Sequence, residues 1–341
     1  MKVDEIRQVF LEFFEKKGHT VLPSDSLVPQ NDPTLLFTGA GMNQFKEYFL
    51  GLKKDLKRAA TSQKCLRTGD LEEVGRTPYH HSFFEMLGNF SFGDYFKREA
   101  IAWAWELLTE EFKMPEERLR VTVHEKDVEA YQIWRDDIKI RQDWIYKMDD
   151  KSNFWPANAP KDGPNGPCGP CSEIYFDQHP DIKTEDISSQ RFTEIWNLVL
   201  TQFDRQEGGK LVPLQNKNID TGMGLERLAC VLQGKKTNFE IDIFQPINAK
   251  IQLYIRNQNE FNTSAGAVFY KQHLYSIADH IRAIVFALAD GVIPSNEGRG
   301  YVIRKLIRSA MMHAHRLSTA GIQVPFLGGI TTPGFRLPTS E

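Results

Sequence analysis

The sequence predicts an α+β fold, in which an antiparallel β-sheet flanked by helices is followed by an all-α domain. Two observations lead to this class. Between residues 1 and 245, strand-type segments lie among irregularly spaced helical segments, which does not fit regular βαβ units. Beyond residue 245, strand patterns disappear and long helical patterns take over. We therefore expect one domain over residues 1–245 and a helical domain over residues 246–341.

Apolar spacing and the residues that interrupt it predict the individual elements. Apolar residues from Val3 to Phe14 recur at helical spacing and Gly18 follows as a stop, so a helix is expected before the chain leaves it at Val21. The expected strands lie at 35–37, 61–66, 82–89, 120–124, 191–204, 211–214 and 218–220. The expected helices lie at 95–112, 128–138, 223–232, 273–289 and 297–317, and the tail beyond them has weak periodicity. Prolines and glycines concentrated in residues 151–172 predict an ordered but irregular loop.

Composition limits the classes of function. A net charge of −3 with 26% charged residues suits a soluble globular protein and gives no support to a general polyanion binder, so DNA is not an expected partner. No apolar run of about 18 residues exists and the start lacks an apolar signal region, so neither membrane insertion nor secretion is expected. Four cysteines without four-ligand zinc spacing predict structural thiols in a reducing compartment, the cytoplasm, and no metal site made by the protein.

The first group of chemically interesting residues spans two predicted strands and the loop between them. Arg67 ends the first strand, and His81, Phe83 and Phe84 open the second, so a hairpin would bring Arg67 and His81 together. A guanidinium there could clamp a phosphate, and an aromatic ring could stack on a base. The alternative is a surface arginine beside core phenylalanines.

A second group lies on the long strand predicted at 191–204. Strand periodicity places Asn197, Val199 and Thr201 on one face. An amide beside a small branched residue suits a site for a small polar ligand, whereas the alternative is a mixed sheet face with one satisfied amide.

The third group is a strand that ends in Asp220, a turn with Gly222 and Gly224, and a helix that carries Arg227 near its start. Glycines let a ligand approach the backbone, and a helix N-terminus favours anions. The spacing matches neither the dinucleotide-binding GxGxxG pattern nor a P-loop, and alone it is a weak signal.

Together, the three groups resemble the second and third motifs of class II aminoacyl-tRNA synthetases, and the first helix resembles their first motif. Longer blocks narrow the resemblance to the alanyl-tRNA synthetase family. They are FLEFFEKKGH, NDPTLLFTGAGMNQFK, HHSFFEMLGNFSFGDYFK, GPCGPCSEIY, EIWNLV, DTGMGLERLACVLQG and PSNEGRGYVIRKLIR, between residue 5 and about residue 317. The resemblance implies the class II fold, ATP-dependent activation of L-alanine to alanyl-adenylate, and transfer of alanine to the 3′ end of tRNA(Ala).

The resemblance also implies roles at the ATP site. Arg67 matches the arginine that holds the α-phosphate and the alanine carboxylate, and Arg227 matches the one that contacts the γ-phosphate, so both are expected catalytic residues. The other residues implied to line the nucleotide are His81, Phe83, Met86, Gly222 and Gly224. Mg²⁺ is implied with ATP, and Glu173 is either an indirect ligand of that ion or a plain surface acid.

At the alanine site, the resemblance implies that Asp220 receives the ammonium group. Asn197 and Val199 match residues around the substrate, and Trp155 matches a tryptophan that closes the site. A carboxylate facing an ammonium forms a charge-assisted hydrogen bond, so Asp220 suits its role on physical grounds as well.

Recognition of tRNA is implied for the region around the basic helix at 297–317. Asn296 matches the position that reads the G·U pair of the tRNA(Ala) acceptor stem. The further residues expected at the RNA are Asp70, Arg299, Arg304, Lys305 and Arg308. The alternative is an ordinary solvated basic face.

One departure from the family concerns the loop after Arg67, which here is only Thr68-Gly69-Asp70 and lacks the family's lysine and histidine. Two other functions therefore stay open. One is an alanine-activating paralogue with a weak or different acyl acceptor. The other is a catalytically silent RNA-binding paralogue, although intact Arg67, Asp220 and Arg227 argue against it. The family's longer chains also suggest that the helical domain is truncated here.

Overall fold

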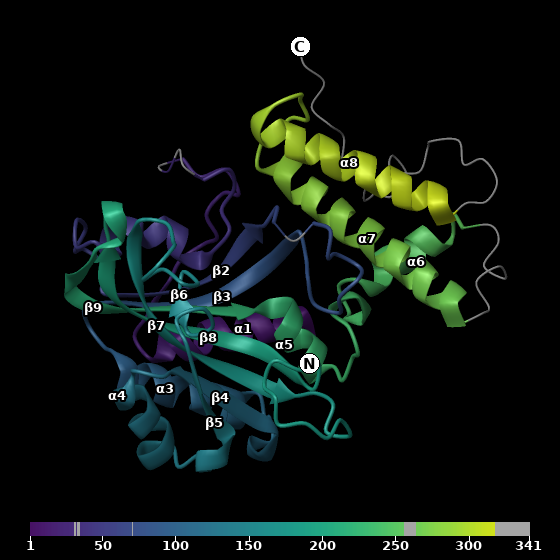
Figure 1. Cartoon of the computed structure of the whole chain (residues 1–341). Coiled ribbons are helices and arrows are strands. Elements are labelled where there is room, and N and C mark those ends of the chain that lie inside the picture. Colours follow the sequence, from purple (N-terminus) through teal and green to yellow (C-terminus); the bar gives the residue numbers. More distant parts are fainter. Residues whose placement is uncertain (31, 33–34, 70, 256–263, 318–341) are drawn as a thin grey trace. The chain divides into compact units, whose positions relative to one another are not determined.

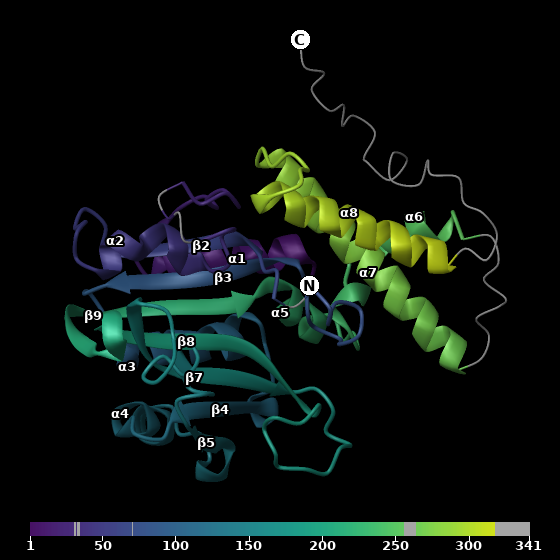
Figure 2. The same ribbon diagram turned by 45° about the horizontal axis from the view of Figure 1, so that its top comes forward.

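A mixed nine-stranded sheet forms the centre of the computed structural model. The structure describes residues 1–317 except 31, 33–34, 70 and 256–263, so predicted Asp70 and the predicted weakly ordered tail lie outside the described residues. The strand order is β1-β2-β3-β9-β8-β7-β4-β5, and β6 pairs with β7 off this path. Figure 2 shows strands β3, β9, β8, β7 and β4 stacked in this order.

The strands overlap over long stretches in the middle of the sheet. Their bounds are Thr20–Val21 (β1), Arg58–Leu66 (β2), Phe83–Phe92 (β3), Leu119–His124 (β4), Ile145–Met148 (β5), Phe154–Trp155 (β6), Gly166–Asp177 (β7), Phe192–Arg205 (β8) and Leu211–Gly224 (β9). The pairs among β3, β9, β8, β7 and β4 are antiparallel, and β1/β2 and β4/β5 are parallel. The predicted α+β class with an antiparallel sheet is thus confirmed for its centre.

Helices α1 (Val3–Lys16), α3 (Lys97–Glu106), α4 (Val128–Gln132) and α5 (Leu225–Leu232) cover one face of this sheet. Helix α2 (Lys46–Phe49) lies on the other face, where the ring of Phe49 packs against Phe90 of β3. In α1, Phe10 and Phe14 are fully buried, and their rings lie 6.0 and 6.3 Å from the ring of Trp196 on β8. Gly18 then adopts a φ of +84°, a conformation that favours glycine and ends the helix. Because Trp196 faces α1, its neighbour Asn197 faces the other side of the sheet.

The chain divides into two compact units. One contains residues 1–65 and 84–235, and the other contains residues 66–83 and 236–341. The helices of the second unit are α6 (Gln245–Gln252), α7 (Ser264–Ala289) and α8 (Gly298–Leu317), and Figure 1 shows α7 and α8 side by side. Their apolar faces bury residues such as Ile277 and Ile303. Among the described residues, no helix is both long and apolar enough for a membrane crossing.

Some predicted elements were wrong. Residues 35–37 form no strand, because Phe37 is buried from a loop whose Thr38 amide bonds to the carbonyl of Leu27. The segments at 211–214 and 218–220 are one strand, and the predicted helices at 95–112 and 128–138 each finish in a π-helical turn, at Leu107–Glu111 and Ile133–Asp137.

The predicted loop at 151–172 is also wrong at its end, because residues from Gly166 onward form β7. Its register shifts between Cys168 and Cys171, which accommodates the proline between them. A Cβ on Gly169 would lie 2.2 Å from the carbonyl oxygen of Leu200, so only glycine permits this close approach of the two strands. Turn-type composition does not reveal such a strand, since its pairing depends on a partner distant in sequence.

Candidate active site

The residues predicted to surround a small ligand meet on the face of the sheet opposite α1. In the register of β8 and β9, Asn197 lies opposite Gly222 and Val199 lies opposite Asp220. Directly opposed residues of an antiparallel pair point to the same side of the sheet. Asn197, Val199 and Asp220 therefore lie on one side of the sheet, and strand periodicity predicted this for Asn197 and Val199.

Asp220 is a buried carboxylate at the centre of this face. It is 7% exposed, and Phe90 of β3 and Val199 of β8 are its cross-strand neighbours. Burial raises the pKa of its carboxyl from 3.8 to about 7. Among the described residues no salt bridge neutralises it, so a ligand that brings a positive charge would relieve the desolvation of its ionised form.

Asn197 adds a second acceptor to the same face. Its amide Nδ2 donates to Oε1 of Glu173 at 3.1 Å, whereas its Oδ1 is buried without a hydrogen-bond partner. A buried acceptor left unpaired is costly, and a donor from a ligand would satisfy it. Asp220 and Asn197 together therefore suit an ammonium group.

Glu173 is not the surface acid that one interpretation of the sequence expected. It lies opposite Asn197 on β7, is 9% exposed and accepts a 2.7 Å hydrogen bond from the Tyr175 hydroxyl. Burial, together with the nearby charge of Glu194, raises its pKa to about 8. A carboxyl that holds its proton near neutral pH is a poor ligand for Mg²⁺, so Glu173 fits the orientation of Asn197 better than a metal role.

The same face continues toward the predicted nucleotide residues. Met86 of β3 lies opposite Gly224, and a Cβ built on Gly222 would lie 2.9 Å from the Met86 sulfur. Gly224 is the N-cap of α5, whose Arg227 donates to Oε2 of Glu194 at 2.9 Å. Gly222 thus lets Met86 pack directly against the backbone. Gly224 precedes a helix start that carries a guanidinium, an arrangement that suits phosphate groups.

Trp155 lies on the short strand β6, where it pairs with Gly169 of β7. It is half-buried. Its implied role in closing the alanine site remains a prediction.

Two residues predicted at the nucleotide are instead enclosed by protein. Phe83 has no exposed surface, and its ring stacks on Phe286 with centroids 4.3 Å apart. His81 is 5% exposed, and both of its ring nitrogens have partners, Asp279 at 3.0 Å and Asn238 at 3.2 Å. We therefore assign Phe83 to the core, and His81 could reach a nucleotide only by losing one of these partners.

The sequence pattern implied Phe83 at the nucleotide and did not separate it from its neighbour Phe84. Phe84 is half-buried and shares its side of β3 with Met86, two residues further on, which makes it the better candidate for contact with a base. The alternation of side chains along a strand indicates that one of the two phenylalanines faces the site. Because both neighbours are phenylalanine, the sequence does not show which one does.

We expect Phe83→Leu and Phe84→Leu to separate these roles. Phe83→Leu should destabilise the fold by about 1–2 kcal/mol, because it leaves a cavity in the core, without raising the KM for ATP. Phe84→Leu should raise the KM for ATP several-fold with little change in melting temperature. Thermal unfolding and ATP titration of both variants would check this, and a raised KM in Phe83→Leu alone would reverse the assignment.

Arg67 lies in the second unit, directly after β2. Its backbone N–H donates to the carbonyl of Ser82 at 2.9 Å, which fits the predicted hairpin. In the same unit, Asn296 accepts a hydrogen bond from Arg304. Four of the residues predicted at the tRNA lie on α8: Arg299, Arg304, Lys305 and Arg308. Arg299 is half-buried, and the other three are exposed, as is Asn296.

A cavity of about 350 Å³ lies beside α8. The side chains that line it include three cations and one acid, together with histidines and a serine: Arg76, Lys305, Arg316, Glu72, His280, His313 and Ser309. Its cationic side chains suit a phosphate, and the RNA contact implied for this helix remains a prediction.

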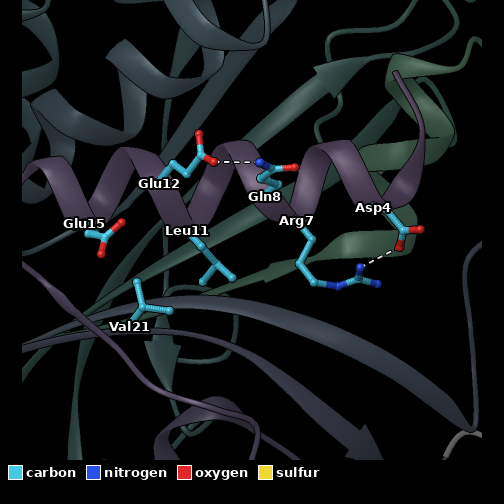
Figure 3. Close-up of a pocket in the computed structure, with 7 residues that line it drawn as sticks. All are labelled: Asp4, Arg7, Gln8, Leu11, Glu12, Glu15 and Val21. Atoms are coloured by element: carbon cyan, nitrogen blue, oxygen red, sulfur yellow. Dashed lines mark hydrogen bonds and ion pairs between the residues drawn. The ribbon is translucent and has the colours of Figure 1, made fainter.

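A second hollow, of about 370 Å³, lies on the outer side of α1 (Figure 3). Its polar groups are committed to one another: Arg7 pairs with Asp4 at 2.7 Å and Gln8 donates to Glu12 at 2.7 Å. Arg7 also pairs with Glu85 at 2.8 Å. These contacts stabilise the helix surface and bring together no group suited to chemistry.

Among the described residues, no group of three or more histidine, cysteine or acidic side chains could hold a metal ion, and all four cysteines are buried free thiols. Burial raises the pKa of the Cys168 thiol to about 11 and that of Cys171 well above its usual range. Cys168 and Cys171 are therefore unreactive thiols at neutral pH.

Comparisons with known proteins identify the family of this chain. The family model for tRNA synthetases class II (A) matches residues 5–333. An alanine–tRNA ligase of Petrotoga mobilis is 53% identical over 336 residues, covering 96% of this chain and 37% of that protein. One from Legionella pneumophila (strain Corby) is 50% identical over 343 residues, covering 98% of this chain and 38% of that protein. A pyrrolysyl tRNA synthetase structure from Desulfitobacterium hafniense matches 70% of this chain and 71% of its own with a TM-score of 0.40 and 10% identity. The chain thus spans less than two fifths of the length of these curated relatives.

Proposed function

This chain belongs to the family of class II tRNA synthetases (A), and we propose that it activates L-alanine with ATP and passes the alanyl group to the 3′ end of tRNA(Ala). The observation that carries the proposal is the buried, unneutralised carboxylate of Asp220 beside the unpaired Oδ1 of Asn197. These groups fit the ammonium of a small amino acid, and the names of the similar proteins specify alanine for those proteins.

In the proposed activation, a carboxylate oxygen of alanine attacks the α-phosphorus of ATP. The new bond joins that oxygen to the phosphorus, and the bond to the bridging oxygen breaks, so that pyrophosphate leaves with its electron pair. Alanine is already ionised at neutral pH, and no general base is needed. Arg67 would neutralise charge at the α-phosphate and Arg227 at the γ-phosphate, and catalysis consists of in-line positioning and charge stabilisation.

Magnesium is proposed as the companion of ATP, where it would neutralise phosphate charge and help pyrophosphate to leave. The protein residues described above provide no ready-made cage for it, which suits an ion that arrives with the phosphates.

In the proposed transfer, a terminal hydroxyl of the tRNA attacks the alanyl carbonyl and AMP leaves. Asn296 is proposed to read the G·U pair of the acceptor stem, while the basic residues of α8 contact phosphates. Since charging serves translation, we place the activity in the cytoplasm. The short loop after Arg67 favours one second candidate, an enzyme that activates alanine but has a weak or different acyl acceptor.

Pyrophosphate exchange into ATP tests the activation step. We expect exchange with alanine, and weaker exchange with glycine and serine, because one methylene or hydroxyl is discriminated by only about 1–3 kcal/mol. Absence of exchange with all three amino acids would remove the proposal.

Charging of tRNA separates the two candidates. Transfer to tRNA carrying the G·U pair, at least tenfold faster than to a G·C variant, would support the full reaction. Normal exchange without charging of either tRNA would support the second candidate.

A further inference from the structure

One face of α7 contacts the middle and the C-terminal end of the segment 66–83, which carries Arg67. Ser276 donates from its hydroxyl to the carbonyl of Val74 at 3.1 Å, and Gly75 lies so close that a Cβ there would be 2.5 Å from the Ser276 hydroxyl. Six residues later, Arg282 lies over the ring of Phe83 at 4.8 Å. All these residues belong to the second unit, so α7 braces the hairpin segment 66–83 from within it.

Asp279 lies between Ser276 and Arg282 on α7 and is fully buried, with 0% exposure. Its carboxylate accepts from the backbone N–H of Ser82 at 3.1 Å, from the Ser82 hydroxyl, and from Nδ1 of His81 at 3.0 Å and of His280 at 3.2 Å. Burial opposes the charge, but the hydrogen bonds from the two histidines outweigh it and hold the pKa of Asp279 well below its usual range. A fully buried carboxylate with these donors is a rigid anchor.

The anchor fixes the backbone next to the predicted catalytic arginine. Ser82 donates to Asp279 through its N–H and accepts from the backbone N–H of Arg67 through its carbonyl. His81 is fixed as well, because its Nε2 hydrogen-bonds to the side-chain amide of Asn238 at 3.2 Å and its ring stacks on Phe244. The chain of contacts therefore runs from α7 through one residue, Ser82, to the backbone of Arg67.

We propose that Asp279 is a positioning residue for alanine activation: it holds Ser82 so that the strand pairing at Arg67 sets the direction of the guanidinium. This inference rests on the proposed function of Arg67. It gives the helical unit, which carries the residues proposed for tRNA, a direct mechanical connection to the arginine of the first step. Catalysis is sensitive to small displacements of a charge-stabilising group, so loosening the anchor should slow the reaction without removing a substrate contact.

Asp279→Asn in the full chain tests this proposal by pyrophosphate exchange. The amide presents an N–H toward donors that need an acceptor, so kcat should fall about 10- to 100-fold, whereas the KM for alanine should change less than twofold. Ser82→Ala, which removes the hydroxyl and keeps the backbone contact, should lower kcat by a smaller factor of about 3–10. Asp290→Asn, the same substitution directly after α7, is the matched control and should keep wild-type rates.

A double-mutant cycle with Arg67→Lys separates positioning from general loss of stability. If Asp279 acts through Arg67, Asp279→Asn should lower kcat much less in the Arg67→Lys background than in the wild type. An equal fold-loss in both backgrounds, at a temperature where all variants are folded, would overturn the proposal.

Hydrogen exchange provides a readout that does not depend on the reaction. The amide of Arg67 should exchange faster in Asp279→Asn than in the wild type or in Asp290→Asn. Faster exchange in a protein without any alanine-dependent activity would contradict the proposed function but leave the anchor intact. Unchanged protection of this amide would sink the anchor itself, whatever the activity.

Discussion

Asp220→Asn is expected to lower kcat/KM for alanine by about 30- to 1,000-fold, the effect of losing a buried charge-assisted partner. The asparagine keeps the shape of the side chain but cannot neutralise the ammonium. Since Asp220 has no cationic partner in the protein among the described residues, the fold does not depend on its charge. The measurement is pyrophosphate exchange over a range of alanine concentrations, with the KM for ATP expected to stay within twofold.

The same variant should be at least as stable as the wild type at pH 8. Burial raises the folded-state pKa of Asp220 from 3.8 to about 7. A raised carboxyl pKa means that the folded state favours the protonated form, so its stabilising contribution is complete below about pH 4 and is lost as the pH rises through about 7. Above that pH the buried charge destabilises the folded state by an amount on the order of a few kcal/mol, and asparagine removes this cost.

The pH dependence of alanine binding follows from the same pKa. In the wild type the KM for alanine should fall as the pH rises from 6 to 8, because the ionised carboxylate binds the ammonium. In Asp220→Asn this dependence should be absent. Asp204→Asn, the same substitution near the C-terminal end of the neighbouring strand β8, is the control and should keep both the wild-type KM and its pH profile. Normal alanine kinetics in Asp220→Asn would assign the ammonium to another group.

Arg67→Ala is the second change with a large expected effect, a fall in kcat of about 100- to 1,000-fold in pyrophosphate exchange. Removal of one group that stabilises developing charge typically costs this much. Arg67→Lys should recover only part of the rate, since an ammonium cannot form the paired hydrogen bonds of a guanidinium.

Arg76→Ala provides the matched control for this prediction. Arg76 lies in the same segment and is exposed, and it lines the cavity beside α8. It should leave exchange unchanged, because that reaction needs no tRNA. Exchange by Arg67→Ala at more than a third of the wild-type rate would exclude Arg67 from the chemistry of the first step.

Part of this site could be read from the sequence because a strand has a strict period of two. Asn197 and Val199 were placed on one face for that reason, and the register of β8 confirms it. The position of Asp220 opposite Val199 could not be read in this way, since it depends on how β9 aligns with β8. The family resemblance implies that Asp220 lies in this site, and the structure adds that its carboxyl is buried and has a raised pKa.

The failures also have physical causes. Phe83 and Phe84 are adjacent and of the same type, so the sequence pattern cannot tell which one faces the core. The residue that stacks on Phe83 is Phe286, which is distant in the sequence. Likewise, β7 exists because β4 and β8 pair with it on both sides, although its glycines and prolines favour a turn. In both places tertiary pairing overrides the local preference.

Direct detection of the adenylate tests the central claim that this chain activates alanine. The whole chain would be incubated with Mg²⁺, α-labelled ATP, labelled L-alanine and pyrophosphatase, and the protein-bound small molecules would be separated. The account predicts alanyl-adenylate carrying both labels, at up to about one equivalent per chain, and little of it in Asp220→Asn. Recovery of ATP with no doubly labelled product from the folded wild-type chain would contradict the account.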